Sequence, residues 1–252
     1  LYMHKYHEED IPKLSTCKSP IAMQAAMIKT YFAEMYEIDK DNIVSVSLTP
    51  CVSKKSERVI YPDTDFVITT SELVFMIKEL GIDFKNLRDS EFDKLLGKGS
   101  GGGLIFGASG GVTESVLRTA YYMINKEKAP EEFYKLESIR GDNEFKETYV
   151  DMKKYKLHVA SISKVKTVSE HYDELRKYDF VEVMACPGGC IGGGGQPMVA
   201  IKDMDNIRKE RIKSMYNEDS RLKIKESYLN PEIRDAYDYS INKGKVNLHT
   251  NH

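Results

Sequence analysis

The chain has 252 residues, of which 41% are hydrophobic and 30% are charged, and its formal net charge at pH 7 is −2. These values are typical of a globular protein with one large domain or two lobes. The small net charge gives no reason to expect nucleic acid or an anionic membrane surface as a partner. No apolar run reaches the roughly 18 residues of a membrane span, and no signal peptide opens the sequence. We therefore expect a cytoplasmic protein, whose four cysteines serve metal binding or catalysis rather than disulfides.

The first half of the sequence predicts short strands in alternation with helices. The opening residues, from Leu1, are typical of the middle of a helix, and Ser19 with Pro20 marks the start of another that continues to Met35. Thr69 and Glu72 form a capping box sequence before a further helix. The other predicted elements are strands at 43–48, 65–68 and 103–106 and helices at 70–80 and about 113–125.

The second half continues the alternation after a charged, turn-rich stretch over 126–152 in which no firm element is predicted. Strands are expected at 157–162 and 180–184, and Thr167 with Glu170 is expected to cap the helix between them. The last part of the chain predicts exposed helices, whose interleaved acidic residues disfavour a nucleic-acid surface. Alternating strands and helices indicate an α/β fold with mostly parallel strand pairing.

The strongest functional signal is the segment that follows the strand at 180–184. Cys186 and Cys190 are separated by Pro-Gly-Gly and are followed by four glycines. Glycine is tolerated in such numbers where the backbone must take positive φ or approach another group closely. Thiolates on such a backbone suit a soft metal, because nearby amides can donate to sulfur. Cys51 and Gly107–Gly111 also follow predicted strands, so we expect all three loops at one edge of a sheet.

Several interpretations of the cysteines remain open at this point. The pair could be two small buried residues, but the glycine context disfavours this. Zinc prefers a Cys-x-x-Cys spacing or an adjacent histidine, and neither is present. Three converging thiolates favour an iron–sulfur cluster. Such a cluster normally has four protein ligands, and the remaining cysteine, Cys17, lies just before a helix cap.

Weaker motifs have simpler interpretations. Gly97–Gly102 matches the letters of a dinucleotide fingerprint, but no strand precedes it, so a flexible glycine turn is the better interpretation and nucleotide binding is the alternative. His4 and His7 fit a solvated helix surface better than a metal pair. Lys54 and Lys55 are either surface charges or, beside Cys51, a cation facing an anionic centre.

Together these motifs resemble the catalytic domain of the large subunit of FeFe hydrogenases. Leu48–Lys55 resembles the second cysteine motif of that family, and Met184–Pro197 resembles the third almost unchanged. The glycine-rich stretch Ile105–Glu114, the segment Ser15–Pro20 and the closing Leu248–Thr250 are also similar. The resemblance extends over essentially the whole chain, and its third motif is highly specific.

The resemblance implies an H-cluster, in which a four-iron, four-sulfur cubane is joined through a cysteine to a di-iron unit with CO, cyanide and a dithiolate bridge. It implies that Cys51, Cys186 and Cys190 ligate the cubane, with Cys190 also bridging to the di-iron unit. Lys54 would donate a hydrogen bond to a cyanide, and Ser15 would belong to the proton path. The residues implied to line the di-iron pocket are Pro50, Phe106 and Met184. Ferredoxin or upstream iron–sulfur domains would exchange electrons, with H2 and protons as substrates.

Some features depart from the family pattern. The first motif, a Thr-Ser-Cys-Cys-Pro segment that supplies the fourth cubane ligand, is absent, and Cys17 does not stand at its position. Thr49 replaces a methionine found in the most active members, and Ile21 replaces a frequent glutamine. We therefore expect the chain to be the C-terminal portion of the domain, unable to hold a complete H-cluster alone, and of a slower, sensory or divergent subgroup.

The predicted fold is that of the FeFe-hydrogenase catalytic domain, with two intertwined lobes. Residues 61–184 approximate one lobe, and 1–60 with 185–252 contribute to the other. The predicted function is reversible H2 oxidation and proton reduction. The alternative is a sensory or otherwise non-catalytic iron–sulfur protein related to these hydrogenases. Among such relatives, the Pro-Gly-Gly spacer and Lys54 disfavour a role in cluster assembly.

Overall fold

The structure, a computed structural model, describes residues 2–93, 95–239, 244 and 246–250. The chain divides into two compact units, one formed by residues 1–82 with 234–252 and the other by residues 83–233. Within the described part of the chain, no helix is long and apolar enough to cross a membrane.

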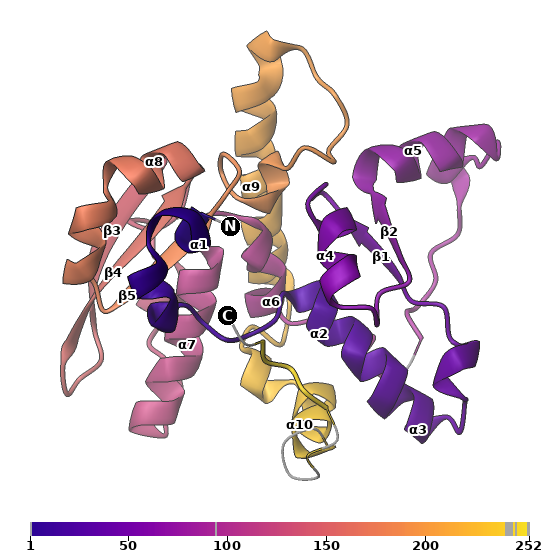
Figure 1. Cartoon of the computed structure of the whole chain (residues 1–252), viewed down its shortest axis with the longest axis horizontal. Coiled ribbons are helices and arrows are strands. Elements are labelled where there is room, and N and C mark those ends of the chain that lie inside the picture. The colour runs from indigo at the N-terminus through magenta and orange to yellow at the C-terminus, as the bar shows by residue number, and fades with distance from the viewer. Residues whose placement is uncertain (1, 94, 240–243, 245, 251–252) are drawn as a thin grey trace. The chain divides into compact units, whose positions relative to one another are not determined.

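The first unit contains a two-stranded parallel sheet with short helices (Figure 1). Strand β1 (Val46–Thr49) pairs with β2 (Phe66–Thr69). Ser19 caps helix α2 (Pro20–Met27), accepting from the Ala22 N–H, and the helix continues through a π-helical turn, Ile28–Phe32, into α3 (Ala33–Met35). The other helices are α1 (Tyr2–Tyr6), α4 (Lys54–Ile60) and α5 (Thr70–Glu79), while α10 (Pro231–Tyr237) begins in the second unit.

The second unit contains a three-stranded sheet in the order β3–β4–β5. Strand β4 (Lys156–Ser163) lies in the middle, antiparallel to β3 (Phe145–Asp151) and parallel to β5 (Phe180–Met184). Helix α7 (Gly111–Asn125) contacts β4 and β5 (Figure 1). The remaining helices are α6 (Gly101–Leu104), α8 (Val165–Glu170) and α9 (Met204–Arg221).

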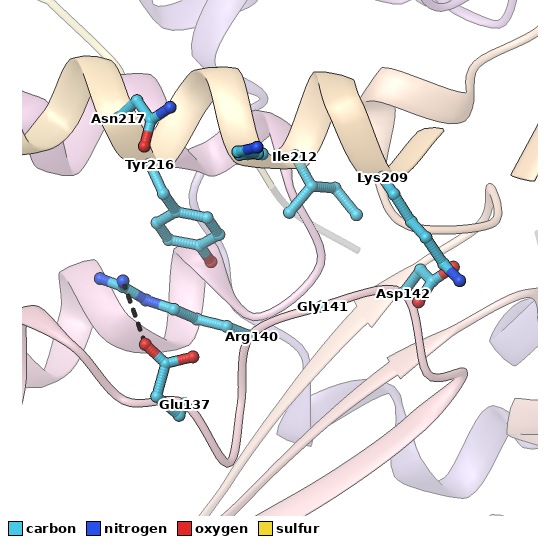
Figure 2. A pocket seen from close by; sticks show the side chains of 9 residues that line it. Glu137, Arg140, Gly141, Asp142, Lys209, Ile212, Tyr216 and Asn217 are labelled. Atoms are coloured by element: carbon cyan, nitrogen blue, oxygen red, sulfur yellow. Dashed lines mark ion pairs between the residues drawn. The ribbon is translucent and has the colours of Figure 1, made fainter. Parts of the chain in front are cut away.

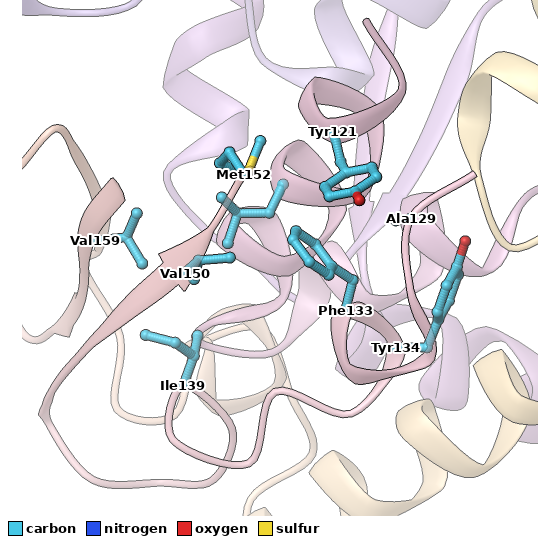
Figure 3. Packing of buried hydrophobic residues seen from close by; sticks show 9 residues of the cluster. Tyr121, Ala129, Phe133, Tyr134, Ile139, Val150, Met152 and Val159 are labelled. Carbon is cyan, nitrogen blue, oxygen red and sulfur yellow. The ribbon is translucent and has the colours of Figure 1, made fainter. Parts of the chain in front are cut away.

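The hydrophobic core of the second unit lies between α7 and the sheet. Tyr121 of α7 packs edge-on against Phe133, with ring centroids 4.9 Å apart. Ile139 and Val159 complete the cluster from the loop and from β4, as Figure 3 shows. Burial of such side chains stabilises the fold by about 25 cal/mol per Å² of apolar surface. This cluster therefore stabilises the sheet from which the cysteine loop leaves.

A buried ion cluster joins α7 to α9. The Arg118 guanidinium has no exposed surface and binds Glu114 and Asp219, the latter at 2.8 Å between Nη2 and Oδ2. Arg140 reaches the same Glu114 carboxylate. Hydrogen bonding and opposite charge outweigh the cost of burial and raise the pKa of both arginines.

The structure of the glycine-rich stretch differs from the prediction. The predicted strand at 103–106 is wrong, because this stretch forms α6 and a 3-10 turn, Ile105–Gly107. The glycines allow α9 and α7 to approach closely: a Cβ on Gly101 would lie 1.9 Å from Asp219 Oδ1 of α9, and one on Gly102 would lie 2.6 Å from Ser115 Oγ of α7. The N–H groups of Gly101 and Gly102 donate to the carbonyls of residues 224 and 225, so both serve packing.

Other elements also differ from prediction. Strand β3 lies in the stretch 126–152, where none was expected. Thr167 does not cap α8: the helix begins at Val165, and the Thr167 hydroxyl instead donates to Glu144. The expectation that the three predicted site loops lie at one edge of a single sheet is wrong, because β1–β2 and β3–β4–β5 are separate sheets. The capping box at Thr69 and Glu72 and the strand at 180–184 are confirmed.

The compact units do not follow the boundaries of the predicted lobes. Residues 61–82 belong with the N-terminal segment, because β2 pairs with β1. Residues 185–233 belong with the β3–β4–β5 sheet, because Asp219 of α9 shares the ion cluster of α7. The predicted lobes, 61–184 and 1–60 with 185–252, remain a prediction.

Candidate metal centre

The Cys186–Cys190 loop leaves the end of β5 and turns through glycines. Cys186 and Cys190 are half-buried, while Gly188 and Gly189 are buried and have φ values of +70° and +98°. The Gly189 N–H donates to the Cys186 carbonyl at 3.1 Å, and the Gly193 N–H donates to the Cys190 carbonyl at 2.9 Å. A 3-10 turn, Cys190–Gly192, completes the loop. Since L side chains rarely adopt such φ values, this loop requires glycine between its two thiols.

The loop is fixed to the turn that precedes α7. The Ser109 N–H donates to the Gly188 carbonyl at 2.9 Å. A Cβ on Gly189 would lie 2.6 Å from Ser109 N and 2.8 Å from the Gly107 carbonyl oxygen. These contacts leave no room for a side chain, so glycine at 189 is a packing requirement as well as a conformational one.

Helix α9 holds the other side of the loop. Arg211 Nη1 donates to the Ile191 carbonyl at 3.0 Å, and Ile191 packs with Ala108 and Ile212 in a small buried cluster. The Arg208 stem lies against Gly188, where a Cβ would come within 2.5 Å of Arg208 Cδ. The loop is therefore clamped between α9 and the turn before α7.

A buried polar network supports this turn. The Glu182 carboxylate of β5 accepts from the N–H groups of Gly110 and Thr113 at 2.6 and 2.8 Å. The same carboxylate accepts from the Ser161 hydroxyl, which is 3.0 Å from the Ser109 hydroxyl. Glu182 thus joins β4, β5 and the N-terminus of α7 behind the cysteine loop.

A buried lysine completes the network. Lys146 Nζ donates to the carbonyls of Ser109 and Gly141, each at 2.9 Å. Burial lowers the pKa of Lys146 to about 8, against the opposing effect of the Glu182 charge. The burial of Lys146 and Glu182 could not be predicted from the sequence, because charged residues are usually exposed. Their hydrogen-bond partners, Ser109 and Gly110, are brought to them only by the tertiary structure.

The first unit contains the other predicted site residues. Cys51 follows β1 and is half-buried, as is Pro50, and the Cys51 N–H donates to the Thr49 hydroxyl at 3.2 Å. Lys54 opens α4, where its ammonium pairs with Glu57, whose other oxygen accepts from the Ser19 hydroxyl. The Ser19–Glu57–Lys54 chain thus links the start of α2 to α4.

Ser15 and Cys17 lie on an exposed segment before α2. The Ser15 hydroxyl accepts from the Cys17 N–H at 3.3 Å. Cys17 is exposed and forms an isolated antiparallel bridge with His249. An exposed thiol in a backbone bridge has none of the loop features of Cys186 and Cys190.

The predicted site residues thus fall into two groups. In the second unit, Met184 ends β5 just before Cys186, and the turn that contains Phe106 contacts the turn that begins at Cys190. Pro50, Cys51, Lys54 and Ser15 belong to the first unit. Over the residues that the structure describes, neither unit gathers three His, Cys, Asp or Glu side chains into a metal site. The convergence of Cys51 with Cys186 and Cys190 therefore stays a prediction.

The Cys186–Cys190 loop fits an iron–sulfur group as far as its own atoms go. It offers two half-buried thiols on a glycine backbone from which side chains are excluded. Thiolate is the usual protein ligand of iron–sulfur clusters, and burial and hydrogen bonding around the sulfurs set their potentials.

A separate cavity of about 320 Å³ opens beside α9 (Figure 2). Arg140 stacks on the Tyr216 ring, with 4.1 Å from Cζ to the ring centroid. Burial raises the pKa of Tyr216, whose hydroxyl has no hydrogen-bond partner among the described residues. Glu137 and Asp142 line the cavity together with Lys209 and Lys213, and this mixture of charges does not select an anionic or a cationic ligand.

Comparison with known proteins identifies the family. A sequence model described as "Iron only hydrogenase large subunit, C-terminal domain" matches residues 1–194. The chain is 39% identical to the periplasmic [Fe] hydrogenase large subunit of Nitratidesulfovibrio vulgaris, over 79% of this chain and 49% of that protein. It is 38% identical to iron hydrogenase 1 of Clostridium pasteurianum, over 92% of this chain and 42% of that protein. The chain thus spans less than half the length of these relatives.

More distant relatives have another role. Proteins named as cytosolic iron–sulfur assembly components or factors match at about 30% identity, including one from Pongo abelii at 31% over 77% of this chain and 44% of that protein. Family membership alone therefore does not choose between catalysis and assembly.

A solved structure has the same fold. An [FeFe]-hydrogenase, studied for its inactivation by oxygen, aligns with a TM-score of 0.76 and 32% identity, covering 99% of this chain and 72% of that chain. The parallel pairing of β1–β2 and of β4–β5 agrees with the predicted α/β class. The chain therefore belongs to the family formed by the C-terminal domains of iron-only hydrogenase large subunits.

Proposed function

We propose that this chain forms part of the catalytic domain of an FeFe hydrogenase, which interconverts H2 with two protons and two electrons at an H-cluster. The observation that supports this most strongly is the loop from Cys186 to Cys190 after β5, in which two glycines with positive φ lie between two half-buried cysteines. A loop so shaped, in a member of this family, is built to hold a soft metal centre.

In this proposal Cys51, Cys186 and Cys190 would hold the iron–sulfur cubane, and Cys190 would also hold the di-iron unit. The thiols bind as thiolates, so ligation releases their protons. The H-cluster, when bound, supplies the redox chemistry of hydrogen. The chain supplies ligation, exclusion of water and a route for protons.

The other predicted residues have supporting roles. Pro50, Phe106 and Met184 present half-buried apolar surface and would keep water from the di-iron pocket. The Lys54 ammonium has three donors, of which the Glu57 pair uses one, and another would hold a cyanide. Ser15, whose hydroxyl is exposed, would relay protons along the path between the surface and the cluster.

The partners and location are part of the proposal. Ferredoxin or other iron–sulfur domains would exchange electrons with the cluster. We propose a cytoplasmic location, although one relative is named as periplasmic. The formal charge of −2 supports neither nucleic acid nor an anionic membrane as a partner.

Iron loading of cysteine variants tests the ligand assignment. The intact protein that contains this sequence is reconstituted with iron and sulfide, and bound iron and acid-labile sulfide are measured. Cys51→Ser, Cys186→Ser and Cys190→Ser should each weaken iron retention by at least about tenfold, because a lost ligand costs at least as much as a lost supporting contact. Cys17→Ser is the matched control and should load like the wild type. Equal loading by all four variants would refute the assignment.

A non-catalytic iron–sulfur protein is the second candidate. It is favoured by the relatives named as iron–sulfur assembly factors and by Thr49 in the second motif. Infrared spectra of the intact, matured protein separate the two. Bands of iron-bound CO and cyanide together with H2 turnover support catalysis, such bands without turnover support sensing, and an iron–sulfur protein without the bands supports the assembly class.

A further inference from the structure

We propose that Arg211 raises the reduction potential of the iron–sulfur group held by Cys186 and Cys190, by placing an unneutralised positive charge on their loop. This inference rests on the proposed function, because it concerns the same loop. It assigns a positioning and tuning role to a residue of α9 that lies outside every cysteine motif.

The contact of Arg211 with the loop is direct. Arg211 is half-buried, and its Nη1 donates to the Ile191 carbonyl at 3.0 Å. Ile191 is the residue next to Cys190, and its side chain is buried against Ala108 and Ile212. Arg211 is therefore anchored one residue from a predicted ligand, on a segment that cannot easily move.

Within the described part of the chain, no carboxylate lies within salt-bridge distance of the Arg211 guanidinium. The neighbouring Arg208 differs, because its Nη1 lies 3.0 Å from Asp205 Oδ1 while its stem packs on Gly188. Of the two arginines that contact the loop, Arg211 thus contributes a net positive charge and Arg208 is neutralised by its own helix.

Electrostatics gives the direction of the effect. A guanidinium stays protonated at every working pH and is weakly hydrated, so it keeps its charge when half-buried. Adding one electron makes an iron–sulfur group more negative, and a nearby cation stabilises that state more than the oxidised one. Net charge and hydrogen bonding around the ligands are known levers on iron–sulfur potentials.

A redox titration of charge variants tests the proposal. The intact protein that contains this sequence is loaded with iron and sulfide, titrated with dithionite, and followed by the EPR signal of the reduced cluster. Arg211→Met should lower the equilibrium constant for one-electron reduction about three- to tenfold, and a tenfold change is about 59 mV. Arg211→Lys keeps the charge and should recover most of the shift. Arg208→Met should give a smaller shift, and Lys213→Met, on the same helix, none.

Each outcome decides the question. Equal shifts in Arg211→Met and Arg211→Lys would show that packing rather than charge is responsible, and would overturn the inference. A cluster that forms with an unchanged potential in Arg211→Met overturns it as well and leaves the proposed function intact. If the Arg211→Met variant does not bind iron and sulfide, Arg211→Gln replaces it, because glutamine keeps an amide donor for the Ile191 carbonyl. If neither neutral variant loads, Arg211 acts in forming the loop and the inference fails. A wild type without any iron–sulfur signal removes the proposed function and the inference together.

Discussion

Arg118 is the residue on which the second unit depends most directly. Its fully buried guanidinium is shared by Glu114 and Asp219. Arg118→Met keeps most of the volume but removes the ion-pair partner of the buried Asp219 and leaves the buried Glu114 with Arg140 alone. We expect a loss of about 3–5 kcal/mol in the free energy of unfolding, because breaking a buried ion pair from one side leaves uncompensated charge. Urea unfolding followed by far-UV circular dichroism measures it.

A surface arginine provides the control. Arg221 also ends near a carboxylate, that of Glu218, but both side chains are largely exposed. Exposed pairs contribute about 0–1 kcal/mol, so Arg221→Met should change stability by less than about 1 kcal/mol. Similar losses in the two variants would mean that burial of the Arg118 cluster has no special energetic weight.

Lys146 gives the protein a stability change at alkaline pH. Burial lowers its pKa in the folded state to about 8, below the value of about 10.4 in an unfolded chain. Between these values the unfolded chain binds more protons, so the free energy of unfolding rises with pH. The full rise corresponds to about 3 kcal/mol. Denaturation from pH 7.5 to 9.5, the lower part of this window, should show part of it.

Comparison with variants isolates this group. Lys146→Met removes the titrating ammonium and should flatten the rise, although it also loses the donors to the Ser109 and Gly141 carbonyls. Lys154→Met, at an exposed neighbouring position, should keep the wild-type slope. A wild-type stability that falls over this range would contradict the assigned direction.

At the scale of the elements, two glycine turns allow the effect of backbone strain to be distinguished from the effect of close packing. Gly189 and Gly141 both have positive φ, +98° and +93°. A Cβ at 189 would lie 2.6 Å from Ser109 N, whereas a Cβ at 141 would meet nothing within 4 Å. Both alanine variants should lose about 1 kcal/mol or more from strain, and only Gly189→Ala should also lose iron loading, since its loop must move. Thermal unfolding and iron analysis measure the two effects. Equal iron loss in both variants would assign the effect to strain alone.

Elements with strong local signals could be predicted from the sequence. The Thr69–Glu72 capping box and the strand ending at Met184 follow from neighbouring residues alone. Strand β3 could not, because its polar residues are strand-forming only through pairing with β4, as Lys146 pairs with Ser161. Helix α6 could not be predicted either, because the close contact that requires Gly101 is with Asp219 of α9, which is far away in the chain.

The same distinction holds for the candidate site. The Cys186–Cys190 loop is a local motif, so spacing and glycine content were enough to identify it. Arg211 contacts that loop directly, and Glu182 and Lys146 support the turn before α7 to which the loop is fixed. Nothing in the sequence neighbourhoods of these three residues marks them. The resemblance to a family assigned roles to the motifs, but it gave no account of the charged residues that support them.

At the scale of the whole molecule, the second unit is continuous in sequence and has its own hydrophobic core. Residues 83–233 contain the sheet β3–β4–β5, the core around Phe133 and all partners of the Arg118 cluster. We expect this segment, produced alone, to fold and to unfold cooperatively in urea. Arg118→Met within the segment should lower its transition midpoint, as in the whole chain. A non-cooperative transition would mean that the first unit contributes to the stability of this core.

The isolated segment also tests how the ligands are distributed between the units. It contains Cys186 and Cys190 but lacks Cys51, which belongs to the first unit. If all three cysteines ligate one cluster, the segment should retain iron at least about tenfold more weakly than the intact protein, even when its circular dichroism is that of a folded domain. Cys186→Ser should then abolish the remaining binding, because one thiolate cannot hold the cluster. Full and stable iron loading of the segment would instead show that the loop completes its ligand set within one unit, and Cys51 would lose its assigned role.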